Sequence, residues 1–202
     1  MLANGHRLAL LFMLLLGNSI FAADVDEVEP NDTIAEAQTI VSGDSVNGAL
    51  ADDSDDDYYA LVVEAAGTLT VRIDTAVNHS YGWTLSVINT QGDVLGQLRC
   101  RGISCRDSGE SLNIGIASAG TYYVRVEPYL DYSNYAPTDP YQVSATYSST
   151  TGGVELEPNN TSEQANSLAF DATVDGQLSN DSDQDYYALV VEAAGTLTVR
   201  ID

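Results

Sequence analysis

The stretch Asp57-Tyr-Tyr-Ala-Leu-Val-Val-Glu-Ala-Ala-Gly-Thr-Leu-Thr-Val-Arg-Ile-Asp74 occurs twice in the chain, and its second occurrence, residues 185–202, is identical. Apolar and polar residues alternate on both sides of Ala65-Ala66-Gly67. This alternation is typical of two half-buried strands joined by a turn, so we expect an antiparallel hairpin over residues 57–74. The offset of 128 residues (from 57 to 185) holds without a gap back to Glu27 and Glu155, which indicates two copies of one unit.

The first copy contains further short alternating segments bounded by turn residues, at 46–50, 83–87, 94–98, 112–116, 122–126 and 141–147. Short strands at this spacing predict an all-β antiparallel sandwich. Thr33-Ile34-Ala35-Glu36 has the form of a capping box and predicts a short N-terminal helix to about Ile40. The second copy reaches only the counterpart of Asp74, so we expect it to be truncated.

Residues 1–22 have the pattern of a secretory signal peptide. Arg7 supplies the positive charge, residues 8–16 are an unbroken apolar run, and Ala22-Ala23 offers small residues for cleavage. The apolar run is shorter than the roughly 20 residues of a membrane-spanning helix, which favours a cleaved signal over an anchor. We therefore expect a secreted protein, with the periplasm or the cell surface as alternatives, organised as a sandwich at 24–148, a linker at 149–153 and a second copy at 154–202.

The composition is strongly acidic: 7 basic residues stand against 30 acidic ones, for a formal net charge of −23. Such a surface repels nucleic acid and anionic membranes, so we expect neither as a partner. It fits cation binding, charge screening at high salt, or simply the solubility of a secreted protein.

Two cysteines, Cys100 and Cys105, lie close together in the sequence. After export they predict a disulfide, because the compartment is oxidising. Metal binding by this pair would need two further soft ligands, and His79 is the one histidine that follows the signal segment.

Several motifs in the same order resemble the bacterial pre-peptidase C-terminal domain. The matching stretches are Glu27-Val-Glu-Pro-Asn-Asp-Thr33, the Asp-rich loop that runs into Asp57-Tyr58-Tyr59, the Ala-Gly-Thr turn, and residues 119–126. The resemblance covers about 24–148 and begins again at Glu155. It implies a non-catalytic, jelly-roll-like sandwich carried by secreted hydrolases. Relatives in bacterial collagenases bind collagen and hold calcium with their N-terminal segment.

Calcium prefers carboxylate and carbonyl oxygens, and residues two apart on an extended segment face the same way. The resemblance implies calcium ligands in both copies, namely Glu27, Glu29, Asn31, Asp32, Asp53, Asp55 and Asp57, and then Glu155, Glu157, Asn159, Asp181, Asp183 and Asp185. Asn160 replaces the acid at Asp32, which we expect to weaken that site. The alternatives are capping of a helix and a solvated acidic loop.

Tyr129, Tyr132 and Tyr135 suggest an exposed aromatic face for a polymer, or else a layer packed over the end of the sandwich. The sequence has no His-Glu-x-x-His, Gly-x-Ser-x-Gly or phosphate-loop motif. We expect a non-catalytic module that binds an extracellular protein or polysaccharide, or targets a linked hydrolase. The alternatives are a structural spacer repeat and a hydrolase with an unrecognised active site.

Overall fold

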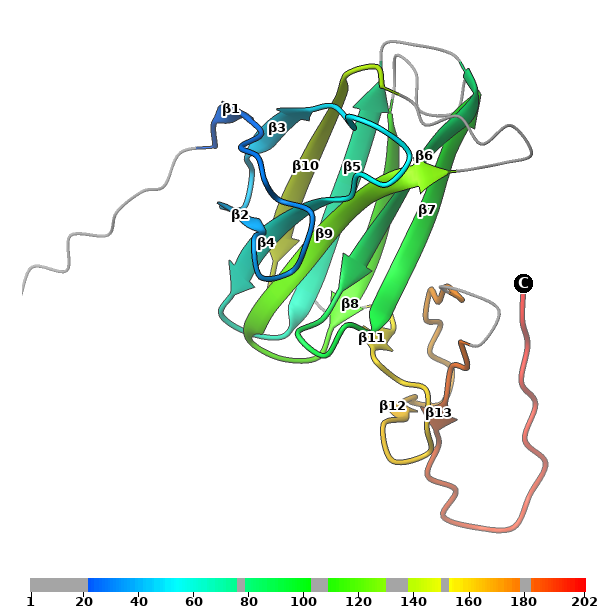
Figure 1. The fold of residues 1–202 in the computed structure, drawn as a ribbon. Coiled ribbons are helices and arrows are strands. Elements are labelled where there is room, and N and C mark those ends of the chain that lie inside the picture. The colour runs from blue at the N-terminus through cyan, green and yellow to red at the C-terminus, as the bar shows by residue number, and fades with distance from the viewer. Residues whose placement is uncertain (1–21, 76–78, 103–108, 130–137, 150–152, 179–182) are drawn as a thin grey trace, which may run out of the picture.

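The computed structural model describes residues 22–75, 79–102, 109–129, 138–149, 153–178 and 183–202. All regular secondary structure within these residues is β-strand (Figure 1). None of the described segments forms a helix that could cross a membrane.

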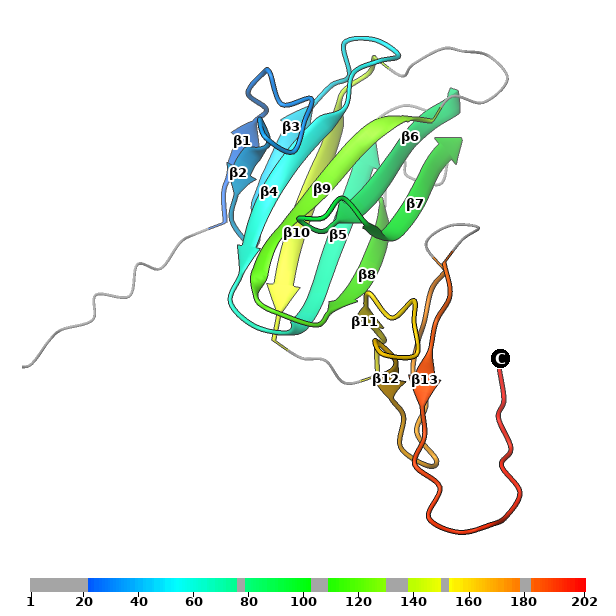
Figure 2. The ribbon, with the colours of Figure 1, turned by 60° about the horizontal axis from the view of Figure 1, so that its bottom comes forward.

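The first copy, together with β11 from the start of the second copy, forms two facing sheets (Figures 1 and 2). The six-stranded sheet has the order β1 (Asp24–Asp26), β3 (Ser45–Gly48), β10 (Tyr141–Ser148), β5 (Gly67–Thr75), β8 (Glu110–Ile116) and β11 (Leu156–Glu157). The five-stranded sheet has the order β2 (Gln38–Ile40), β4 (Asp57–Val63), β9 (Gly120–Tyr129), β6 (His79–Ile88) and β7 (Val94–Gly102). A separate parallel pair joins β12 (Asn166–Ser167) and β13 (Tyr187–Ala188).

The long strands follow a jelly-roll order. Without the short β1, β2 and β11, the sheets read β3-β10-β5-β8 and β4-β9-β6-β7, and every pairing among these strands is antiparallel. Paired double-sheet Greek keys of this kind define a jelly roll. The predicted all-β, jelly-roll-like sandwich is confirmed.

The expected hairpin over residues 57–74 is wrong. β4 pairs with β2 and β9, whereas β5 pairs with β10 and β8 in the other sheet. The turn at Ala65-Ala66-Gly67 therefore carries the chain from one sheet to the other. The reason is that both strands bury an apolar face, and facing sheets let the two faces share one core. That core takes Tyr59, Leu61 and Val63 from β4 and Leu69, Val71 and Ile73 from β5.

The expected helix from Thr33 to about Ile40 is also wrong. Thr33 and Glu36 do meet, because Glu36 N–H donates to Thr33 O (3.0 Å) and the Thr33 hydroxyl donates to Glu36 Oε2 (2.8 Å). This single turn ends at once, since residues 38–40 enter β2 and pair in parallel with β4. Strand pairing outweighs the local helix signal because it ties the segment to the sheet.

Residues 154–202 repeat the beginning of this arrangement. The pairing of Asn166 with Tyr187 corresponds, at the repeat offset, to that of Gln38 with Tyr59. Beyond β13 the described chain is extended and exposed, with Val190 at 80% and Ile201 at 95% exposure. Identical residues form β4 and β5 in the first copy because partner strands lie on both sides of each there.

Candidate metal centre

The segment that follows β1 crosses one end of the sandwich. Glu27 N–H donates to Asn47 O (3.0 Å) at the end of β3, and Tyr58 N–H donates to Asn31 O (2.9 Å) at the start of β4. β3 and β4 belong to different sheets. The acidic segment is therefore fixed to both layers, and it brings its side chains over the Asp-rich loop that precedes β4.

Two groups of carboxylates meet at this end of the sandwich. Glu27, Glu29 and Asp57 form one group, and Glu29, Asp32 and Asp55 form the other. Within each group one oxygen of every residue lies within 4.8 Å of the others. The groups share Glu29, so they are adjacent. Of the residues predicted from sequence, Asp53 lies outside both groups and is exposed.

Hydrogen-bond donors hold the inner group from the core side. Glu27 Oε1 accepts from Ala49 N–H (2.9 Å), and Glu27 Oε2 accepts from the Tyr59 hydroxyl (3.2 Å). The Tyr141 hydroxyl donates to Asp57 Oδ2 and lies 2.6 Å from the Tyr59 hydroxyl. Sequence reasoning missed both tyrosines. For Tyr59 a signal existed, because Asp57 and Tyr59 alternate onto the same inward face of one strand.

Asn31 is completely buried, and its side-chain amide oxygen faces acceptors only. Turned toward them, the amide nitrogen lies 3.0 Å from Asp57 Oδ1 and 3.1 Å from Glu29 Oε2. Such surroundings suit the amide nitrogen when no cation is present. They suit the amide oxygen when a cation sits among the carboxylates, because calcium takes amide carbonyls as well as carboxylates as ligands.

Burial makes the charges of this cluster unfavourable. Desolvation raises the pKa of Asp57 to about 8, against the lowering effect of the Tyr141 hydrogen bond, and Glu27 and Asp55 raise it further. Desolvation likewise raises the pKa values of Glu27 and Glu29. The pKa of Asp32 is raised first by its hydrogen bond with Asp55. A bound cation would favour the ionised carboxylates and so offset the effect of burial, because its charge is opposite to theirs.

The second copy builds the inner group again. Glu155, Glu157 and Asp185 bring their oxygens within 4.8 Å of one another. Glu155 Oε1 accepts from Gln177 N–H (2.5 Å), and Glu155 Oε2 accepts from the Tyr187 hydroxyl (2.6 Å). These contacts are those of Glu27 with Ala49 and Tyr59, moved by the repeat offset. The cluster thus forms around its own strand pair β12–β13.

Three oxygens of this second cluster are buried without a hydrogen-bond partner, namely Glu157 Oε1, Asn159 Oδ1 and Asp185 Oδ1. Glu157 is 3% exposed and Asn159 is wholly buried. Burial raises the pKa of Glu157 to about 7 and that of Asp185 to about 6. An unpaired buried acceptor costs about 1–3 kcal/mol. Oxygens in this state fit a cation, which would coordinate them.

The outer group is not repeated in the second copy. Asn160 stands where the first copy has Asp32, and its Oδ1 accepts from Gln184 N–H (3.2 Å). Asp183 lies close enough to Glu157 for its charge to raise the pKa of Glu157. No acidic group containing Asp183 occurs among the residues that the structure describes. Asp181 lies outside the described residues.

Two glycines allow the close approach at each inner group. A Cβ atom at Gly48 would overlap Glu27 Oε2 and the Tyr141 hydroxyl. A Cβ atom at Gly176, its counterpart, would lie 2.8 Å from both Glu155 Oε2 and the Tyr187 hydroxyl. Each glycine therefore leaves room for the glutamate that the acidic segment carries.

The other predicted sites are described only in part. Cys100 is buried in β7 opposite Trp83, but Cys105 lies outside the described residues, so the disulfide stays a prediction. Tyr129 ends β9 half-buried, and the Arg99 guanidinium lies over its ring, 5.5 Å from the centroid. Tyr132 and Tyr135 lie outside the described residues as well. The aromatic face therefore also stays a prediction.

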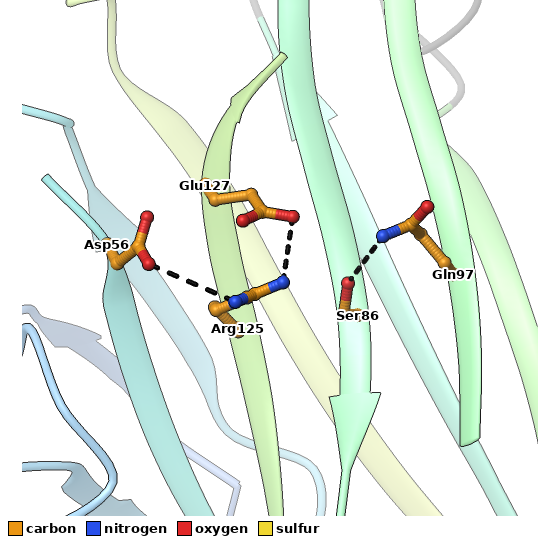
Figure 3. Close-up of polar contacts among 5 residues, drawn as sticks. All are labelled: Asp56, Ser86, Gln97, Arg125 and Glu127. Atoms are coloured by element: carbon orange, nitrogen blue, oxygen red, sulfur yellow. Dashed lines mark hydrogen bonds and ion pairs between the residues drawn. The ribbon is translucent and has the colours of Figure 1, made fainter. Parts of the chain in front are cut away.

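The outer face of the five-stranded sheet carries a polar strip (Figure 3). The Arg125 guanidinium on β9 lies 2.8 Å from Glu127 Oε1 and 4.0 Å from Asp56 Oδ2. On the neighbouring strands Gln97 Nε2 donates to the buried Ser86 hydroxyl (3.3 Å). The carboxylates of this strip thus have a cationic side chain beside them.

No family model matches the chain. The pre-peptidase C-terminal domain of collagenase from Bacillus anthracis is similar in structure, with 19% identity over 55% of this chain and 95% of that one, at a TM-score of 0.43. PliG, a periplasmic inhibitor of g-type lysozyme from Aeromonas hydrophila, shows 15% identity over 63% of this chain and 100% of that one, at a TM-score of 0.38. CorA, a surface-associated copper-binding protein of Methylomicrobium album BG8, shows 8% identity over 55% of this chain and 98% of that one, at a TM-score of 0.38. These values show a weak resemblance only.

Proposed function

We propose that this protein is a secreted, non-catalytic accessory module whose acidic segments are tied to the sandwich by calcium. Its role is to bind an extracellular polymer, protein or polysaccharide, or to target a linked hydrolase. One observation carries the proposal: the same inner acid group is built twice, at the same repeat offset and with the same two donors to its first glutamate. The module comprises residues 24–148, followed by a linker at 149–153 and, at 154–202, a repeat of its first part.

The donor set favours calcium over other metals. Every candidate ligand is a carboxylate or amide oxygen, which hard cations prefer, whereas zinc and copper favour nitrogen and sulfur. Calcium takes six to eight oxygens, and magnesium demands a tighter octahedron and keeps its water. The proposed ligands are Glu27, Glu29, Asn31 and Asp57, then Glu29, Asp32 and Asp55, and in the second copy Glu155, Glu157, Asn159 and Asp185.

Calcium would hold the acidic segment against both sheets by neutralising carboxylates that otherwise repel one another. Binding to the folded state alone adds RT ln(1 + [Ca]/Kd), which is about 2.7 kcal/mol at a hundredfold excess over Kd. The accessory role rests on the signal-peptide pattern of residues 1–22 and on the motifs that resemble a domain carried by secreted hydrolases.

The pairing of β11 with β8 favours a second candidate, a structural spacer. It joins the start of the second copy directly to the first sandwich, as in a repeat array, whose units contact their neighbours. Retention on insoluble protein or polysaccharide, measured by sedimentation, separates the two functions. Binding favours the accessory role, and hydrolysis of the same polymers would contradict a non-catalytic module.

Calcium dependence is tested by melting the secreted chain in EDTA, in calcium and in magnesium. Asp55→Asn and Asp53→Asn form a matched pair, because both remove one charge from the same loop and only Asp55 belongs to an acid group. We expect calcium to raise the melting temperature of the parent and of Asp53→Asn, and to raise that of Asp55→Asn less. An equal shift in calcium and magnesium would refute the calcium proposal.

A further inference from the structure

The first strand of the second copy is added to the first sandwich. β11 pairs in parallel with β8, with Leu156 opposite Gly115 and Glu157 opposite Ile116. The counterparts in the first copy, Val28 and Glu29, belong to no strand, and Val28 is 65% exposed. The same segment is therefore docked in one copy and open in the other.

Gly115 leaves the space that the second copy needs to pair with β8. A Cβ atom there would overlap Glu155 O, and its next neighbours would be Glu155 C (2.9 Å) and Leu156 Cδ2 (3.1 Å). The three nearest atoms thus all belong to the second copy. A further hydrogen bond crosses the junction, from Gln177 Nε2 to Gln97 O (3.3 Å).

The docked residues also carry the second acid cluster. Glu155 and Glu157 flank Leu156, and their carboxylates meet Asp185 of the second copy. Glu157 is 3% exposed, with Oε1 buried and unpaired. Both glutamates line a cavity of about 460 Å³ that residues of β5 and β8 line from the other side, among them Thr68, Ser111 and Asn113. One short segment therefore has its main chain on the first sandwich and its carboxylates in the acid cluster of the second copy.

We infer that the second cluster is a cation-dependent clamp between the two copies: an ion held by Glu155, Glu157 and Asp185 fixes β11 on the edge of β8. The inference rests on the proposed function. Without the ion, the three carboxylates repel one another and loosen the strand that carries two of them. Coupling is reciprocal, so docking on β8 must strengthen ion binding as much as the ion strengthens docking.

The test follows amide hydrogen exchange and calcium binding of the secreted chain. Calcium should slow exchange at Ile116 and over residues 155–157 in the parent. Glu157→Gln should abolish that slowing. Its matched control, Glu29→Gln, changes the residue at the same repeat position of the first copy and should keep it. Gly115→Ala should weaken one calcium site by about fivefold or more, a usual size for coupling between sites, and leave the sites of the first copy unchanged.

The outcomes separate the clamp from the proposed function. If titration calorimetry detects no calcium binding to the parent, both fail. If calcium binds and Glu157→Gln removes one site, but calcium leaves exchange at residues 115–116 and 155–157 unchanged, the clamp alone is refuted. An unchanged affinity in a folded Gly115→Ala variant also refutes it.

Discussion

The hydroxyl of Tyr141 donates to Asp57 Oδ2, although the two residues lie 84 positions apart. Tyr141 begins β10 in one sheet and Asp57 begins β4 in the other. Their bond therefore joins the two layers at the end of the sandwich where the acidic segment crosses. Tyr59 completes the network from the side of Glu27. The inner acid group is thus part of the core as well as a candidate ion site.

Tyr141→Phe should destabilise the fold by about 1–3 kcal/mol, because it leaves buried Asp57 Oδ2 without its donor. Urea unfolding in EDTA measures this without a contribution from calcium. Tyr147→Phe is the matched control. Its hydroxyl donates to Ala65 O (3.0 Å) and Ala66 O (3.1 Å) near the surface, so its loss should cost less. Equal losses for the two variants would contradict a special role of the Tyr141–Asp57 bond.

Substitutions at Asp32 and at its repeat counterpart Asn160 should remove a calcium site from the first copy and add one to the second. Asp32→Asn should lower the number of calcium ions bound per chain, because it gives the first copy the residue that the second has. Asn160→Asp should raise that number, since it gives the second copy an acid at the position of Asp32, with Glu157 and Asp183 at the positions of Glu29 and Asp55. Equilibrium dialysis with metal analysis gives the stoichiometry. An unchanged number in both variants would show that Asp32 ligates no ion.

A Val→Asp substitution should lower the stability strongly at Val71 and hardly at all at Val199, which occupies the same position of the repeat. Val71 is 0% exposed in β5, whereas its repeat counterpart Val199 is 69% exposed. Val71→Asp buries an unpaired charge and should cost more than about 4 kcal/mol, whereas Val199→Asp should stay within about 0.5 kcal/mol. Thermal and chemical unfolding measure both. A large loss in Val199→Asp would show that residues 185–202 are packed in solution.

Glu127 should make the free energy of unfolding depend on pH, and Glu127→Gln should remove that dependence. Burial raises the pKa of Glu127 above its ordinary value of 4.5, against the lowering effect of Arg125. The folded state then holds this proton more tightly than the unfolded state. The stability that the protonated Glu127 contributes is therefore fully present below the ordinary pKa, and it is lost as the pH rises through the raised pKa of the folded state.

Glu127→Gln should therefore gain stability relative to the parent as pH rises from about 4. Unfolding free energies of both proteins, measured at a series of pH values in EDTA, give this difference. Curves that stay parallel would show that Glu127 has the same pKa in both states.

Alternation predicted the strands well because it records burial, and burial is local information along a strand. It did not give the partner of each strand. The pattern around Ala65-Ala66-Gly67 suits a hairpin and equally suits a turn that passes between two sheets, since both bury the same faces. Residues 57–74 and 185–202 make the same point more strongly, because identical sequences form long strands in one place and only Tyr187–Ala188 in the other.

Part of the site was visible in the sequence, and part was not. Glu27 and Glu29 sit two apart on an extended segment, so their common direction follows from local geometry. The contact between Tyr141 and Asp57 depends on the whole strand order, which no local pattern contains. Asp53 and Asp55 looked alike because both alternate with Asp57. Only the path of the loop leaves Asp53 exposed and brings Asp55 to Glu29.

The two edges of the six-stranded sheet are both occupied by very short acidic strands, β1 with two aspartates and β11 with Glu157. Pairing between the sheet edges of different molecules is a common route to aggregation, and short, charged edge strands resist such pairing. β1 belongs to the first copy, but β11 belongs to the second. Removing β11 would uncover the backbone of β8 at Gly115 and Ile116. The second copy thus helps to cover an edge of the first sandwich, even though the core of that sandwich lies within the first copy.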